Sequence, residues 1–137
     1  MANKLSTLAV MFPYQAMTAG VTVRVAVSYL AEQSDPSAGR WFWSYHIRIE
    51  NGADKAVQLL SRLWHIVDGR GAEYEVIGDG VVGDMPLIAT GSSFDYVSGC
   101  PLTTPTGYME GCFHMVDEDG QAFDAAIPRF RLIGPIA

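Results

Sequence analysis

Three glycines at a spacing used by nucleotide-binding sites are the strongest chemical signal in this 137-residue chain. The string Gly78-x-Gly80-x-x-Gly83 follows an apolar, strand-like run that ends at Ile77. In a dinucleotide site, such a string leaves a strand and opens a helix whose first N–H groups hold the pyrophosphate. The strand is therefore predicted to be present. A helix after the glycines would indicate a phosphate site, and its absence would indicate a plain turn.

The residues after the glycines argue against that helix. Pro86 and Gly91 interrupt the segment, and the carboxylates of Asp79 and Asp84 would each repel a phosphate by about 1 kcal/mol in water. We therefore interpret the glycines as turn residues that supply positive φ in a crossover loop, residues 78–91. The alternative is a cradle of backbone N–H groups for pyrophosphate or another small anion, with phosphohydrolase activity as its extension.

Histidines and cysteines form no recognisable catalytic or metal-binding pattern. His46, His65 and His114 fall on three separate predicted strands, without the short ligand spacings of zinc sites. Cys100 and Cys112 have no histidine or acid at a known spacing, and we expect reduced, half-buried thiols, although their pairing stays open. The sequence predicts no metal, no cofactor and no enzymatic activity.

Alternation of apolar and polar residues runs through most of the chain, as in strands buried on one face. In residues 57–67 the alternation slips, and a bulge near Leu60 would restore its phase. We predict an all-β, immunoglobulin-like or fibronectin type III-like sandwich of about seven antiparallel strands and no amphipathic helix. The expected strands are residues 21–29, 41–50, 57–67, 73–77, 94–98, 108–116 and 121–132.

A single domain accounts for the whole length. We expect a loosely ordered segment over residues 1–20, the sandwich over residues 21–132 and a tail over residues 133–137. The net charge of −6 and the scattered basic residues argue against nucleic acid and against an anionic membrane surface. No run approaches the length of a membrane span, and no signal peptide is evident, so we expect a cytoplasmic protein.

Several runs of the chain resemble the signature strands of the ApaG family, in order and with matching spacing over residues 21–132. The chain departs from the family pattern at Cys112 and Phe113, where a polar–aromatic pair is usual. The runs are YHIRIEN (45–51), VQLLSRLW (57–64), EVIGDGVVG (75–83), YVSG (96–99), TPTGYMEG (104–111) and IPRFRL (127–132).

The resemblance implies a fibronectin type III-like sandwich without assigned catalysis and a family-level link to cobalt and magnesium efflux. Similar domains fused to an F-box protein and to a polymerase-delta-interacting protein imply protein–protein recognition. We therefore expect a binding module with a protein partner, or a homodimer, whose surface includes loop 78–91 and a neighbouring sheet face. Candidate partner-binding residues are Phe42, whose parity points outward, and Asp84 and Met85 in the loop.

Overall fold

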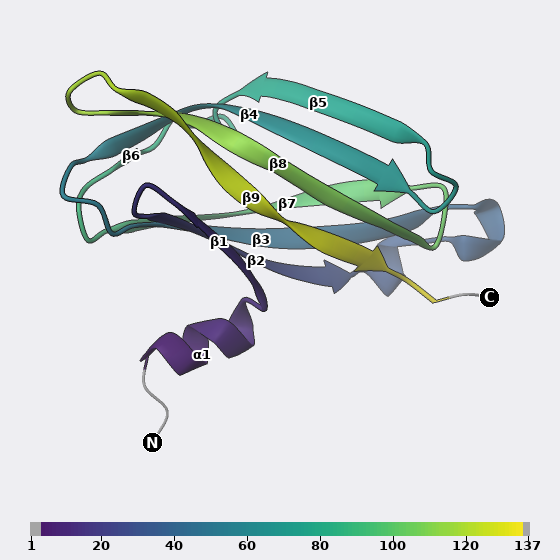
Figure 1. Cartoon of the computed structure of the whole chain (residues 1–137). Helices are drawn as coiled ribbons and strands as arrows, with labels where there is room; N and C mark the ends of the chain where they lie inside the picture. Colours follow the sequence, from purple (N-terminus) through teal and green to yellow (C-terminus); the bar gives the residue numbers. More distant parts are fainter. Residues whose placement is uncertain (1–3, 136–137) are drawn as a thin grey trace.

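A computed structural model describes residues 4–135, without the side chains of residues 4–6 and 9. Two antiparallel sheets pack face to face as a sandwich (Figure 1). This confirms the predicted fold class. The strands are β1 (Tyr14–Thr18), β2 (Val21–Tyr29), β3 (Trp41–Asn51), β4 (Val57–Asp68), β5 (Glu73–Asp79), β6 (Leu87–Ile88), β7 (Ser93–Leu102), β8 (Thr106–Asp117) and β9 (Ala122–Ile133).

The first sheet has the order β1-β2-β3-β7, and its inner face carries the alternating apolar residues. Along β3, every second residue from Trp41 to Asn51 is buried, whereas the residues that alternate with them are only partly covered. A period of two places every second side chain on one face, so the pattern expected from the sequence is confirmed here.

The second sheet has the order β5-β4-β8-β9, with β6 paired to the start of β4. The pairing of β4 with β8 shifts register between Leu59 and Ser61, which confirms the bulge predicted near Leu60. Because the extra residue reverses the facing of the remainder of the strand, Trp64 points inward after the bulge as Leu59 does before it.

Two strands and one α-helix were missed by sequence reasoning, besides the short 3-10 helices Ala31–Gln33 and Pro36–Ala38. Residues 14–18, within the segment expected to be loosely ordered, form β1 and pair with β2. The two-residue β6 lies inside loop 78–91. A short helix, α1 (Lys4–Met11), precedes β1 and projects from the sandwich (Figure 1). β1 and β6 are five and two residues long, too short to display a periodic pattern.

The two long sides of the sandwich differ. On one side β9 lies against β1 and β2, and the backbone N–H of Ala126 donates a 3.1 Å hydrogen bond to the Thr18 hydroxyl. On the other side the edge strands are β5 and β7, which belong to different sheets. The sandwich is therefore closed along β1 and β9, and open along β5 and β7.

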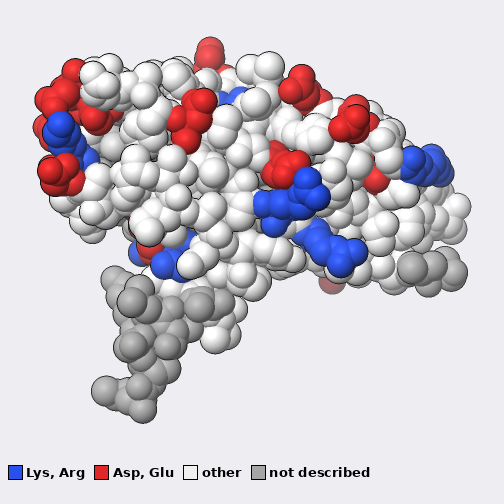
Figure 2. Space-filling view, viewed as in Figure 1, with Lys and Arg blue, Asp and Glu red and all other residues white. Residues whose placement is uncertain are grey.

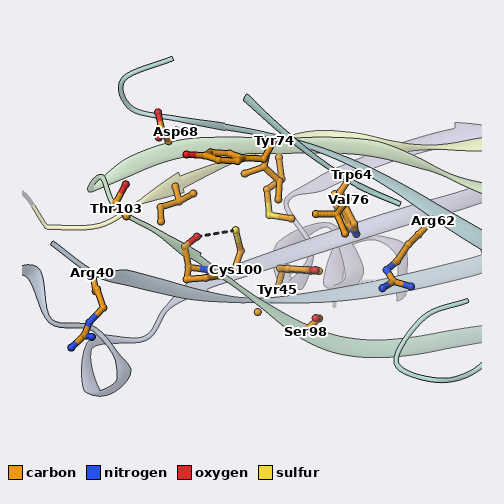
Figure 3. Close-up of a pocket in the computed structure, with 15 residues that line it drawn as sticks. Arg40, Tyr45, Arg62, Trp64, Asp68, Tyr74, Val76, Ser98, Cys100 and Thr103 are labelled. Atoms are coloured by element: carbon orange, nitrogen blue, oxygen red, sulfur yellow. Dashed lines mark hydrogen bonds between the residues drawn. The ribbon is translucent and has the colours of Figure 1, made fainter. Parts of the chain in front are cut away.

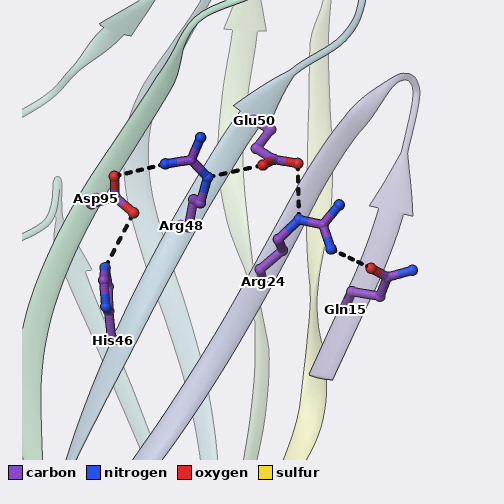
Figure 4. Close-up of polar contacts among 6 residues, drawn as sticks. All are labelled: Gln15, Arg24, His46, Arg48, Glu50 and Asp95. Carbon is purple, nitrogen blue, oxygen red and sulfur yellow. Dashed lines mark hydrogen bonds and ion pairs between the residues drawn. The ribbon is translucent and has the colours of Figure 1, made fainter. Parts of the chain in front are cut away.

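A chain of polar and charged side chains connects all four strands on the outer face of the first sheet (Figure 4). Arg24, only 7% exposed, donates to Glu50 at 2.9 Å and also to Gln15 on β1. Arg48 bridges Glu50 and Asp95 of β7. Partial burial acts to raise the pKa of Glu50, but hydrogen bonds from the two arginines lower it below its usual value. These side chains connect neighbouring strands on the outer face, and the inner face of the sheet stays apolar.

Candidate functional site

A cleft of about 520 Å³ lies between the inner faces of the two sheets at the open side (Figure 3). This volume is within the range of small-molecule and side-chain pockets. β3 and β7 form one wall, and β4 and β5 form the other. Its lining residues are Arg40, Tyr45, Arg62, Trp64, Ile66, Asp68, Tyr74, Val76, Ser98, Gly99, Cys100, Pro101, Leu102, Thr103 and Met109.

Aromatic side chains make the floor of the cleft rigid. Tyr45 and Trp64 pack edge to face with ring centroids 5.3 Å apart, and both contact Phe130 of β9 from behind. Such pairs add stability beyond the area that they bury. Tyr74 and Val76 on β5 form the outer rim and are 50% and 40% exposed. The cleft therefore has a fixed apolar floor and an accessible apolar rim.

Arg62 supplies positive charge at one end of the cleft. Its Nη1 donates to the backbone carbonyls of Asp79 and Gly80 at 3.0 and 2.8 Å, which fixes the guanidinium beside the end of β5. Among the described residues, no carboxylate lies within 4 Å of it. Arg40 stands at the opposite end of the cleft and pairs with Asp35 at 3.7 Å (Figure 3).

The remaining polar groups of the cleft are weak acids or are already engaged. Burial raises the pKa of Cys100 to about 11, so its thiol is protonated at neutral pH. Burial also raises the pKa of Tyr45, although the neighbouring Ser98 hydroxyl and Arg62 oppose this. The carboxylate of Asp68 accepts hydrogen bonds from the backbone N–H groups of Arg70 and Ala72. The charged lining residues are therefore Arg40, Arg62 and Asp68, and among the described residues Arg62 has no carboxylate partner within 4 Å.

The three candidate glycines differ in backbone conformation and in what a side chain at each position would meet. Gly78 lies within β5, and a Cβ there would meet the Arg62 guanidinium at 2.8 Å. Gly80 has φ +60, and a Cβ there would overlap the Asp84 carbonyl oxygen. Gly83 has φ +82 with nothing within 4 Å. The end of the string forms a tight turn from Val81 to Asp84, where a nucleotide site needs the start of a helix.

The hydrogen bonds of that turn involve several of its N–H groups. Gly80 N–H donates to the Leu60 carbonyl, and Val81 and Asp84 exchange two bonds across the turn. The central residues Val82 and Gly83 both have positive φ, as a tight hairpin turn requires. As the loop stands, these three N–H groups are therefore not available to an anion.

The candidate partner-binding residues do not converge. Asp84 and Met85 lie in the exposed loop after β5, and Met85 is 44% exposed. Phe42 is half-buried on the outer face of the first sheet, where its ring covers Gly99 of β7. Sequence reasoning also missed Arg62, Tyr45 and Ser98 as site residues. Arg62 faces inward because of the bulge in β4, and Tyr45 and Ser98 meet only through the pairing of β3 with β7.

The three histidines lie outside the cleft, each against a carboxylate on an outer face. His46 contacts Asp95 at 3.1 Å, and His114 contacts Asp124 at 3.0 Å. Within residues 4–135 as described, no three His, Cys, Asp or Glu side chains are grouped as a metal site would need. Cys100 and Cys112 are both free thiols. Charged residues are likewise scattered on the face in Figure 2, with no basic stripe.

His65 gives a testable pH dependence. It contacts Glu73 at 2.8 Å and Glu110 at 3.3 Å, and these hydrogen bonds raise its pKa. A raised folded-state pKa stabilises the fold fully below about pH 6.5, and this contribution disappears as pH rises through the folded value. His65→Gln is therefore expected to lose more stability at pH 5.5 than at pH 8.5 in urea unfolding. An equal loss at both values would contradict this assignment.

Comparison with known proteins places this sandwich in a family. A family model described as the ApaG domain matches residues 31–117. The chain belongs to the ApaG domain family. It is 51% identical to Protein ApaG of Mesorhizobium japonicum, over 87% of this chain and 92% of that protein. It is 50% identical to Protein ApaG of Methylobacterium sp. (strain 4-46), over 89% and 94%.

Solved structures agree with the family assignment. A protein from Bordetella pertussis solved under the name ApaA has 45% sequence identity and a TM-score of 0.82, over 85% of this chain and 95% of that one. These names state no enzymatic activity, ligand or partner. No helix within residues 4–135 of this ApaG-family chain is long and apolar enough to cross a membrane.

Proposed function

We propose that this ApaG-family chain is a non-catalytic, cytoplasmic binding module that docks an extended segment of a partner protein at the open side of the sandwich. One observation carries the proposal: a 520 Å³ cleft with an aromatic floor opens between two edge strands, β5 and β7. Strand edges pair with added strands through backbone hydrogen bonds, and pockets beside them select side chains.

β5 is the better acceptor of the two edges. Six of its seven residues are exposed, and within residues 4–135 it pairs with β4 alone. Its inward side chains, Tyr74 and Val76, rim the cleft, whereas Pro101 lacks an N–H on β7. A segment paired with β5 would place every second side chain over the cleft.

The loop after β5 extends this surface. Val82, Met85 and Leu87 are exposed apolar residues, and Ile77 at the end of β5 is 75% exposed. Val82 also has φ +43, a strained conformation for a β-branched residue. Strain retained at an exposed apolar tip supports a role for Val82, Met85 and the adjacent Asp84 in partner contact. Phe42 belongs to a different face and is left out of this surface.

The chemistry of the cleft supports binding without catalysis. Its thiol, Cys100, is protonated at neutral pH because burial raises its pKa. Pyrophosphate binding or hydrolysis at the glycine loop has less support, because the N–H groups of Gly80, Val81 and Asp84 donate within the protein. In this proposal, the partner protein accounts for the family-level association with cobalt and magnesium efflux. A second copy of the chain at the same edge would give a homodimer.

The proposal is tested by partner capture with matched lysine substitutions on the two edges. Val76→Lys places a charge in the cleft rim, whereas Val97→Lys places one on the exposed outer face of β7, where Val97 is 58% exposed. We expect Val76→Lys to reduce retention of the captured protein at least tenfold and Val97→Lys to leave it unchanged. The proposal is wrong if both variants retain the partner equally, or if no protein is captured and light scattering gives a strict monomer.

A further inference from the structure

The cleft holds a positive charge that the protein itself does not neutralise. Arg62 is partly buried between the sheets, and its described hydrogen bonds go to two backbone carbonyls. By contrast, Arg24 and Arg48 on the outer face of the first sheet both contact the Glu50 carboxylate. A guanidinium held in place without a carboxylate is a preformed site for an anion, because charge-assisted bonds to arginine are strong and directional.

Two hydroxyl side chains, Tyr45 and Ser98, line the cleft together with this guanidinium. The positive charge of Arg62 opposes the rise in pKa that burial causes in the phenols of Tyr45 and Tyr96. The Tyr96 hydroxyl is buried and has no hydrogen-bond partner among the described residues. Ser98 lies beside Tyr45 on the neighbouring strand and also lines the cleft. Donors around a fixed cation form a pole suited to an oxyanion, set in a protein of net charge −6.

The apolar part of the cleft begins two residues after Arg62 on β4, at Trp64. Trp64 and Ile66 follow Arg62 at intervals of two along the inner face of β4. Residues two apart on an extended segment lie about 7 Å apart on one face. A segment paired with β5 can therefore set one side chain at Arg62 and the next inward one over Trp64.

We propose that the cleft selects a partner segment carrying a carboxylate side chain two residues from an apolar one, with Arg62 binding the carboxylate and Trp64 contacting the apolar side chain. Tyr45 and Ser98 complete the carboxylate pole. Because this inference rests on edge docking as proposed above, its test must separate the two ideas.

The probes are two blocked peptides, acetyl-Thr-Val-Thr-Glu-Thr-amide and its Gln counterpart, titrated into the ¹⁵N-labelled full chain. We expect the Glu peptide to bind about tenfold more tightly, the ratio that one charge-assisted hydrogen bond supports. Its largest shifts should fall on β5 and on the Arg62 side-chain N–H. In 1 M salt the ratio should shrink, because screening weakens the charge pair.

Variants separate a carboxylate site from a general effect of charge. Arg62→Met should reduce the Glu-to-Gln ratio to about one, whereas Arg131→Met, an exposed arginine on β9, should preserve it. Because Arg62 also caps two loop carbonyls, Ser98→Ala provides a second test that leaves those bonds in place, and it should lower the ratio severalfold. Wild-type protein that binds both peptides equally at β5 would overturn the carboxylate site but keep edge docking. If neither peptide shifts β5 or β7, both proposals fall.

Discussion

Gly80→Ala is expected to destabilise the protein by roughly 2–4 kcal/mol, because backbone strain and a steric overlap act together. The left-handed backbone of Gly80 alone would cost an alanine about 1 kcal/mol. The larger part comes from space, because the new Cβ would overlap the Asp84 carbonyl oxygen. The turn between Val81 and Asp84 would have to open, which removes two backbone hydrogen bonds.

Gly83→Ala is the matched control for this prediction. Gly83 belongs to the same string and has φ +82, but a Cβ there meets nothing within 4 Å. Only the backbone cost of about 1 kcal/mol is expected. Urea unfolding of the two variants measures the difference directly. Equal destabilisation would mean that the glycines share one conformational role and that the close approach at Gly80 is unimportant.

Truncating Phe130 to alanine is expected to cost about 3–5 kcal/mol, the usual range for a fully buried aromatic side chain. The ring is completely buried on β9 and contacts Tyr14, Tyr45 and Trp64, so it joins both sheets. Its loss would leave a cavity directly behind the floor of the cleft. We therefore expect weaker partner binding as well as a large fall in melting temperature.

Phe42→Ala serves as the control, because it removes the same side chain from a half-buried position on an outer face. We expect a loss of about 1 kcal/mol there, since less apolar area leaves the protein interior. Partner binding should be unaffected, because Phe42 lies away from the cleft. An equal loss of stability in Phe42→Ala and Phe130→Ala would contradict the placement of Phe130 at the centre of the core.

Much of the fold was predictable because it depends on a local period. All seven expected strands are present, and the slipped alternation after Leu59 marked the bulge correctly. Burial on one face imposes a period of two that a single sequence displays. β1 was missed because a five-residue edge strand displays only two or three positions of any period.

The site was less predictable, because its residues come from five strands. Arg62 and Ser98 are 36 positions apart in sequence, and the bulge in β4 decides that Arg62 faces inward. The glycine string was interpreted as turn residues of loop 78–91, with anion binding as the alternative. Its actual roles are to form a tight hairpin and to seat the Arg62 guanidinium against Gly78.

By itself, the sequence determined that the glycine string could not open a helix, because Pro86 and Gly91 follow within a few residues. It also determined the sandwich class, since alternation is a local property of the chain. Only the tertiary structure decided which edges stay open and where the unpaired positive charge lies. Those features depend on register and strand order between distant segments, which a local pattern does not encode.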